Sequence, residues 1–134
     1  MLPDISLNIL DIAQNSISAR ASIIEIKVEF KTLDNRLKVT VVDNGCGMDE
    51  DTVRSVIDPF YTTRSTRSVG LGIPFFKQEA ECTGGQFWLE STPGKGTTIA
   101  AEFVTTHIDC MPLGDISSTI LSLITMNENI DFVY

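Results

Sequence analysis

Apolar and polar residues alternate with two different periods along the chain, and each change of period marks a predicted element. From Leu2 to Arg20, apolar residues recur every three or four positions, as they do on one face of a helix. Four later stretches alternate with a period of two, which is typical of strands with one buried face: 24–31, 36–43, 86–91 and 97–104. Turn sequences at Asp34-Asn35 and at Thr92 to Gly96 join these strands in pairs. The pattern predicts two hairpins, with helices before and between them.

The inward residues of these elements follow from the same periods. On the first strand we expect Ile24, Ile26, Val28 and Phe30 to face the core, and on the last strand Ile99, Ala101 and Phe103. A short helix from Asp49 to Ile57 would point Val53, Val56 and Ile57 inward. The predicted class is α+β, with a mixed or antiparallel sheet that helices cover on one face.

The first predicted helix has a second, polar face. At about 100° per residue, one broad arc holds apolar residues: Ile5, Ile9, Leu10, Ile12, Ala13 and Ile17. An arc nearly opposite its centre holds Asn8, Asp11, Asn15 and Ser18. A solvated face usually carries Lys, Glu or Arg, which form helices better. The short amide, carboxylate and hydroxyl groups instead suit a ligand or a hydrated cation, with a solvated face as the alternative.

The stretch from Val39 to Met48 is the centre of the predicted site. A β-branched strand ends at Asp43, and Gly45 and Gly47 follow it. A carboxylate at the mouth of a strand is an acceptor, and glycines behind it let a flat ligand approach the backbone closely. An ordinary turn is the alternative, because Asp-Asn-Gly is common turn chemistry.

A basic, glycine-containing loop lies between the hairpins. From Pro59 to Gln78 there is no acidic residue, although the whole chain has a formal net charge of −8. Arginines and hydroxyls precede Gly70-x-Gly72, which opens the next predicted helix. Glycines at a helix N-terminus together with arginines favour a phosphate site, with a flexible polar loop as the alternative.

Composition narrows the functional classes. At 134 residues the chain forms one compact unit, and its net charge of −8 argues against nucleic acid as the main partner. No apolar run approaches the length of a membrane span, so we expect no membrane association. The three cysteines, Cys46, Cys82 and Cys110, lie far apart and form no Cys-x-x-Cys pair, which fits a reducing cytoplasm.

The motifs, taken in order, resemble the GHKL or Bergerat-fold ATP-binding superfamily. Residues 10–16, Leu-Asp-Ile-Ala-Gln-Asn-Ser, resemble its N box, and residues 43–48, Asp-Asn-Gly-Cys-Gly-Met, its G1 box. Residues 58–63 resemble the F box and residues 70–73 the G2 box. The match continues through residues 84–86 and 91–98 and covers roughly Ile5 to Val104. The chain looks most like the catalytic ATP-binding domain of sensor histidine kinases and like the anti-sigma-factor kinases.

This resemblance implies a two-layer α/β sandwich that binds Mg-ATP. Asp43 would accept a hydrogen bond from the adenine amino group, Gly47 would let the base lie close, and Asn15 would ligate magnesium bridging the phosphates. Residues 60–72 would form the lid, and the hydroxyl of Thr97 or Thr98 would help hold the base. The implied nucleotide-binding set is Asn15, Asp43, Gly45, Gly47, Met48, Phe60, Thr62, Thr63, Arg64, Gly70, Leu71, Gly72, Thr97 and Thr98.

The chain also departs from the superfamily pattern. Asp11 stands where its ATPases commonly carry a glutamate that activates water. Aspartate is one methylene shorter, so its carboxylate reaches less far toward a water and Asp11 is a weaker candidate for the general base. Ser68 replaces the usual first glycine of the G2 box. No helix with a phosphoacceptor histidine precedes the N box, so we expect something other than a complete autophosphorylating sensor kinase.

The expected organisation is a histidine-kinase-like ATP-binding domain over residues 1–106 and a C-terminal extension over 107–134. In the extension we predict a helix from Asp115 to Met126 and a strand from Ile130 to Tyr134, whose apolar end suggests a truncated chain or a following segment.

Two functions remain open. One is a stand-alone protein kinase module that passes the γ-phosphoryl group of ATP to a partner protein. The other is a binding module that nucleotide switches without phosphoryl transfer. A gyrase-like ATPase is less favoured, because no transducer domain follows. The expected partners are ATP and a protein or phosphoacceptor in trans, with a homodimer as an alternative assembly.

Overall fold

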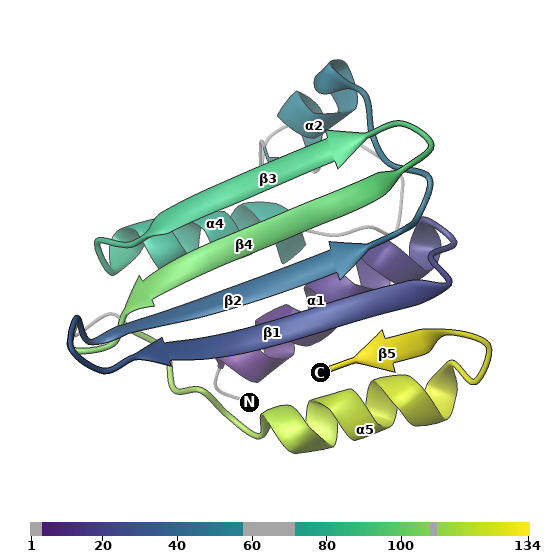
Figure 1. Ribbon diagram of the computed structural model, residues 1–134. Helices are drawn as coiled ribbons and strands as arrows, with labels where there is room; N and C mark the ends of the chain where they lie inside the picture. The colour runs from purple at the N-terminus through teal and green to yellow at the C-terminus, as the bar shows by residue number, and fades with distance from the viewer. Residues whose placement is uncertain (1–3, 58–71, 108–109) are drawn as a thin grey trace.

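The computed structural model describes residues 4–57, 72–107 and 110–134. Its strands are β1 (Ile23–Lys31), β2 (Arg36–Asp43), β3 (Gln86–Thr92), β4 (Gly96–Val104) and β5 (Asp131–Val133). The helices of this described part are α1 (Ile5–Ser18), α2 (Glu50–Val56), α4 (Gly72–Cys82) and α5 (Ile116–Met126). The strands form one sheet in the order β3-β4-β2-β1-β5, and α1 and α4 lie behind it in Figure 1.

The sheet is mixed, and the predicted α+β class is confirmed. The predicted hairpins are present, because β1 pairs antiparallel with β2 and β3 pairs antiparallel with β4. The pairing of β2 with β4 joins them into one sheet, in a register that sets Asp43 opposite Thr97. At the other edge β5 pairs parallel with β1. The final residue of β2 therefore lies beside the start of β4, which turns out to organise the candidate site.

The helix α1 forms where the polar and apolar arcs were predicted, within narrower limits. Asp4 caps its N-terminus by accepting a hydrogen bond from the Leu7 backbone N–H at 2.8 Å. The helix ends at Ser18 rather than Arg20, and Ala19 is its C-cap. The predicted apolar arc faces the sheet and supplies much of the core. One polar-arc expectation is wrong: Asn8 is buried, because residues of the C-terminal extension cover that end of the helix.

Two further burial expectations are corrected. Phe30 is 59% exposed although Leu37, its partner on β2, is buried, because Phe30 lies on the part of β1 that forms the edge of the described sheet, beyond the residues that pair with β5. The inward residues of α2 are only half-buried, and none of that helix is fully buried. The expected core positions of β4, namely Ile99, Ala101 and Phe103, are buried.

The C-terminal segment is packed onto the rest of the molecule at both of its ends. The backbone N–H groups of Ile5 and Ser6, which have no partner within α1, donate to the carbonyl oxygens of Pro112 and Leu113 at 2.9 Å each. On α5, Ile116, Ile120 and Leu123 are buried in the same apolar cluster as the apolar face of α1. The helix and strand at residues 116–133 are thus part of one core with the sheet.

Candidate functional site

The carboxylate of Asp43 lies at the end of β2, between the sheet and α1. Its Oδ2 accepts a hydrogen bond from the Ser16 hydroxyl at 2.6 Å, and its Oδ1 accepts one from the Gly45 backbone N–H at 2.8 Å. The Gly45 bond closes the loop directly after the strand, as Asp residues often do in turns. The Ser16 bond is long-range and joins α1 to the strand end. The Gly45 bond is what an ordinary turn would show, so it fits both the turn and the ligand interpretation of Asp43. A turn does not require the bond from Ser16 on α1.

The two threonines predicted to hold the base lie on opposite faces of the sheet. Thr97 is buried on the helix-covered face, directly opposite Asp43, and its hydroxyl lies 2.7 Å from the Ser91 hydroxyl. Thr98 is the next residue along the strand, so its side chain points to the other face. The structure brings Thr97 together with Asp43 and separates Thr98 from them.

Close backbone contacts fix the loop that follows β2. Gly47 has a φ of +72°, and a Cβ there would lie 2.0 Å from the Thr92 carbonyl oxygen in the β3–β4 turn. Gly96 has a φ of +134°, and a Cβ there would lie 2.0 Å from the Asp43 carbonyl oxygen. Met48 donates its backbone N–H to the Ser91 hydroxyl at 2.8 Å. The close contact with the Thr92 carbonyl oxygen thus requires a glycine at position 47 whether or not a ligand binds.

The polar arc of α1 faces the beginning of α4. A Cβ built on Gly72, the first residue of α4, would lie 3.1 Å from the Asp11 Cβ, so the two helices meet closely there. Asn15 lies one turn further along α1 and is half-buried. Partial desolvation raises the pKa of the Asp11 carboxyl above its usual range. An amide oxygen, a carboxylate and a helix N-terminus therefore meet at this end of the site.

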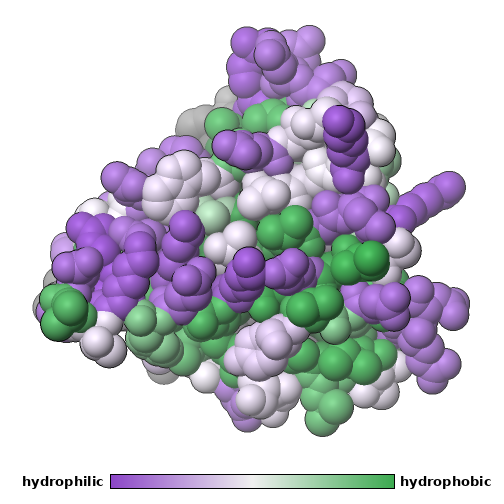
Figure 2. Space-filling view, in the orientation of Figure 1, coloured by the Kyte–Doolittle hydropathy of each residue, from purple (hydrophilic) through white to green (hydrophobic). Residues whose placement is uncertain are grey.

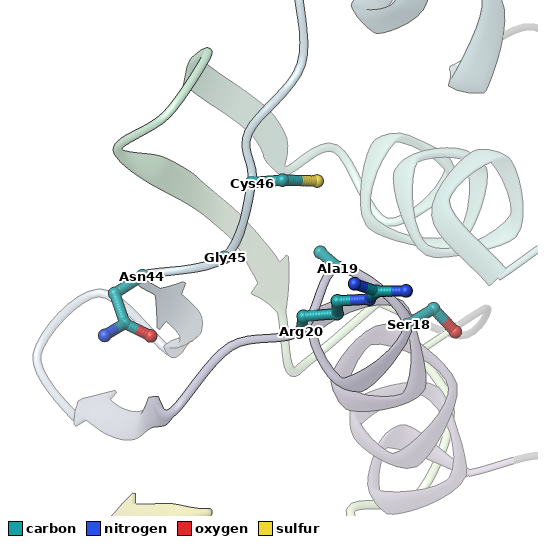
Figure 3. A pocket seen from close by; sticks show the side chains of 6 residues that line it. All are labelled: Ser18, Ala19, Arg20, Asn44, Gly45 and Cys46. Carbon is teal, nitrogen blue, oxygen red and sulfur yellow. The ribbon is translucent and has the colours of Figure 1, made fainter.

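An open cavity of about 510 Å³ adjoins the strand end. It is lined by Ser18, Ala19, Arg20, Asn44, Gly45 and Cys46 (Figure 3). The Cys46 backbone N–H donates to the Ala19 carbonyl oxygen at 3.0 Å, which holds the loop against the end of α1. A Cβ on Gly45 would lie 2.8 Å from the Ala19 Cβ and 3.1 Å from Asp43 Oδ1, so the loop packs against the end of α1 too closely for a side chain at this position.

Several predicted site residues lie outside the described residues. These are Phe60, Thr62, Thr63, Arg64, Gly70 and Leu71, which belong to the predicted lid. Gly72 is described and opens α4, next to Asp11. The part of the predicted site that the structure describes comprises Asp11, Asn15, Asp43, Gly45, Gly47, Met48, Gly72, Thr97 and Thr98.

Sequence reasoning missed three residues that hold this site together. Ser16 donates to Asp43, Ser91 joins Met48 to Thr97, and Gly96 allows β4 to approach the Asp43 backbone. A signal for Ser16 was present, because a serine on the apolar arc of a helix is buried and needs a polar partner. Ser91 and Gly96 lie in a stretch that the sequence marked as a turn and as part of the family match, but their contacts with Met48 and with the Asp43 backbone join segments far apart in the sequence.

The described residues contain neither a metal-binding cluster of side chains nor a membrane-spanning helix. No group of three or more His, Cys, Asp or Glu side chains in residues 4–57, 72–107 and 110–134 is arranged to hold a metal ion. No helix in this part of the chain is both long enough and apolar enough to cross a membrane.

Solved structures share the fold. A blue-light activated histidine kinase from Erythrobacter litoralis EL346 superposes with a TM-score of 0.55 at 18% identity, over 76% of this chain and 30% of that one. Full-length ShkA in complex with AMPPNP superposes with a TM-score of 0.57 at 21% identity, over 72% of this chain and 20% of that one. The structural likeness supports the α+β sandwich.

Sequence comparisons point the same way. The chain is 32% identical over 99 residues to the signal transduction histidine-protein kinase AtoS of Escherichia coli, covering 73% of this chain and 16% of AtoS. It is 33% identical over 97 residues to the sensor protein kinase WalK of Staphylococcus saprophyticus, covering 69% of this chain and 15% of WalK. The chain thus spans about a sixth of these relatives. The model of the histidine kinase-, DNA gyrase B- and HSP90-like ATPase family matches residues 3–107. The chain belongs to this family and carries its ATP-binding domain.

Proposed function

We propose that this protein binds Mg-ATP and passes its γ-phosphoryl group to a residue of a partner protein, as a histidine-kinase-like module. The observation that supports the proposal is the hydrogen bond between Ser16 and Asp43, because it joins the proposed base acceptor to the turn of α1 that carries Asn15, the proposed magnesium ligand. In this proposal residues 1–106 form the ATP-binding domain, residues 107–134 form an extension, and the protein acts in the cytoplasm.

The donor set at the phosphate end suits magnesium held through a nucleotide. Magnesium prefers oxygen ligands and usually keeps several waters, so one protein oxygen together with phosphate oxygens suffices. Asn15 supplies an amide oxygen, and its side chain makes no hydrogen bond to another described residue. The N-terminal end of α4, opened by Gly72, lies next to Asp11 and favours anionic phosphate oxygens. Bound magnesium would neutralise phosphate charge.

We therefore expect ATP binding to require a divalent cation and Asn15. Asn15→Ala should weaken Mg-ATP binding about tenfold or more, equivalent to ~1.4 kcal/mol. The measurement is the dissociation constant by calorimetry, with and without a chelator. Gln14→Ala is the matched control, because Gln14 is an exposed amide on the same turn. An affinity for ATP that is equal with and without chelator would contradict the proposed magnesium site.

We expect the isolated protein to hydrolyse ATP very slowly, because Asp11 is short for a general base. The raised pKa of Asp11 adds a pH signature. A base must be deprotonated, so any hydrolysis through Asp11 should fall as the pH is lowered, and the fall should begin at a higher pH than for an ordinary aspartate. Phosphate release is measured for wild type and Asp11→Asn. Brisk turnover that Asp11→Asn abolishes would favour the ATPase alternative.

A nucleotide-switched binding module is the second candidate. The close joining of the C-terminal segment to α1 favours it, because the first turn of that helix is bonded to residues 112 and 113. The two candidates are separated by incubating the protein and co-purified partners with γ-labelled ATP. Label transferred to a protein supports the kinase, whereas partner binding that depends on nucleotide without transfer supports the switch.

A further inference from the structure

One side chain connects the base end of the site to the helix that carries Asn15. Ser16 is 2% exposed and lies on the core side of α1, where its hydroxyl donates to Asp43 Oδ2 at 2.6 Å. A carboxylate can only accept, so the hydroxyl hydrogen of Ser16 must point at Asp43. The hydrogen bond therefore fixes the direction of the hydroxyl and the rotation of the carboxyl plane together.

The second oxygen of the carboxylate is also held. Oδ1 accepts the Gly45 backbone N–H at 2.8 Å, from a loop that is itself bonded to Ala19 through Cys46. Each carboxylate oxygen has about two acceptor positions, and among the described residues each accepts one hydrogen bond, which leaves each one position without a described donor. Two donors from two different segments leave the Asp43 side chain a single orientation. The free acceptor positions consequently point in fixed directions.

We propose that Ser16 is a positioning residue that sets base selectivity: it orients Asp43 so that the site selects a purine with an amino group at position 6. This inference rests on the proposed nucleotide site. A donor on the base meets a free acceptor position of Asp43 only while the carboxyl plane is held. Without the hydroxyl, the carboxyl can rotate about its Cβ–Cγ bond, and the match to the amino group is lost.

The neighbouring position of Asn15 strengthens this inference. Asn15 and Ser16 are consecutive residues of α1, so one helical turn holds both the proposed magnesium ligand and the partner of the base acceptor. A rigid helix therefore sets the separation between the two ends of the nucleotide. A nucleotide that must contact both Asp43 and Asn15 would bind more weakly if either side chain lost its orientation.

A purely structural role for Ser16 is the competing explanation, and the chain contains a matched comparison. Ser6 also lies on α1, is buried, and donates its hydroxyl to an aspartate at 2.6 Å, namely Asp4 Oδ1. Ser6→Ala and Ser16→Ala therefore remove the same kind of hydrogen bond from the same helix. Only the second of these bonds lies at the nucleotide site.

The test measures dissociation constants for ATP and for purine riboside triphosphate, which lacks the 6-amino group, in the presence of magnesium. Ser16→Ala should weaken ATP binding by about five- to tenfold, the range for one lost hydrogen bond of ~1 kcal/mol or slightly more. Binding of purine riboside triphosphate should stay within about twofold of wild type. Ser6→Ala should leave the affinities for both nucleotides unchanged.

Two further variants keep the outcome decisive. Ser16→Cys preserves the size of the side chain but is a weak donor, so it should lose part of the selectivity even if Ser16→Ala folds poorly. In an Asp43→Ala background, Ser16→Ala should have no further effect on ATP affinity, because the partner is already gone. Thermal unfolding of each variant reports its folding.

The outcomes separate this inference from the proposed function. The inference fails if Ser16→Ala and Ser16→Cys weaken the binding of ATP and of purine riboside triphosphate equally. It also fails if both variants leave the affinity for ATP unchanged, because Ser16 then does not set base selectivity. If wild type binds neither nucleotide, the proposed function itself fails.

Discussion

Replacing Leu123 by aspartate is expected to lower the free energy of unfolding by about 4 kcal/mol, most of the stability of a marginal domain. Leu123 is 2% exposed and lies in the apolar cluster shared by α1, α5 and the sheet. The substitution removes buried apolar surface and places a carboxylate there with no partner in the described core. Urea unfolding followed by circular dichroism measures the effect.

The control lies on the same helix. Leu121 is 65% exposed, so Leu121→Asp changes the same residue type to the same charge without burying it. Its effect should stay within about 0.5 kcal/mol. Equal unfolding midpoints for the two variants would show that α5 is not part of the domain core, and that the C-terminal segment is dispensable for the fold.

The nucleotide site is expected to prefer ATP over GTP by about 100-fold, and Asp43 should be the reason. Adenine presents an amino donor to the carboxylate, whereas guanine presents a carbonyl oxygen at the same place and sets acceptor against acceptor. Sites that hydrogen-bond one substrate group can reject analogues that lack it by roughly 10⁴-fold. Asp43 lines an open hollow together with Ser91 and Thr97 that admits water, and the smaller factor allows for this.

Two substitutions and a control test this preference. Asp43→Ala should weaken ATP binding far more than GTP binding, and so reduce the preference for ATP over GTP. Asp43→Asn keeps the shape and adds an amide donor that can face the guanine oxygen, so it should narrow the preference further. Asp34→Ala removes an exposed aspartate from the distant β1–β2 turn and should change nothing. An ATP-to-GTP ratio near one in wild type, or a ratio that neither Asp43 variant moves, would mean that Asp43 serves only the turn.

Binary patterning was sufficient for most of the elements. Strand β2 was predicted with the same limits that the structure shows, because strict alternation and a flanking turn leave little freedom in a strand. The helix and short strand near the C-terminus were also expected at the observed places, apart from one or two residues at each end. These predictions used only the spacing of apolar residues and the neighbouring turn residues, and the limits of these elements depend on the same local features.

Burial was less predictable where an element extends beyond its neighbours. Phe30 follows the alternation of β1, yet it is exposed because it lies at the edge of the described sheet, where β5 no longer pairs with β1. Asn8 follows the polar arc of α1, yet it is buried because residues from the C-terminal segment lie over it. The period of the apolar pattern predicts on which face of its element a residue lies. Whether that residue is buried depends on whether another element extends far enough to cover it.

The sequence by itself determined the order of the elements, the family motifs and the candidate residues Asp43, Asn15 and Asp11, since each is marked by residue type and spacing within a short stretch. Only the tertiary structure decided that Thr97 rather than Thr98 lies with Asp43, because strand pairing sets which residues share a face. It also decided that Ser16 holds the carboxylate. That contact joins residues 27 positions apart, and the packing of a helix against a strand end leaves no trace in local spacing.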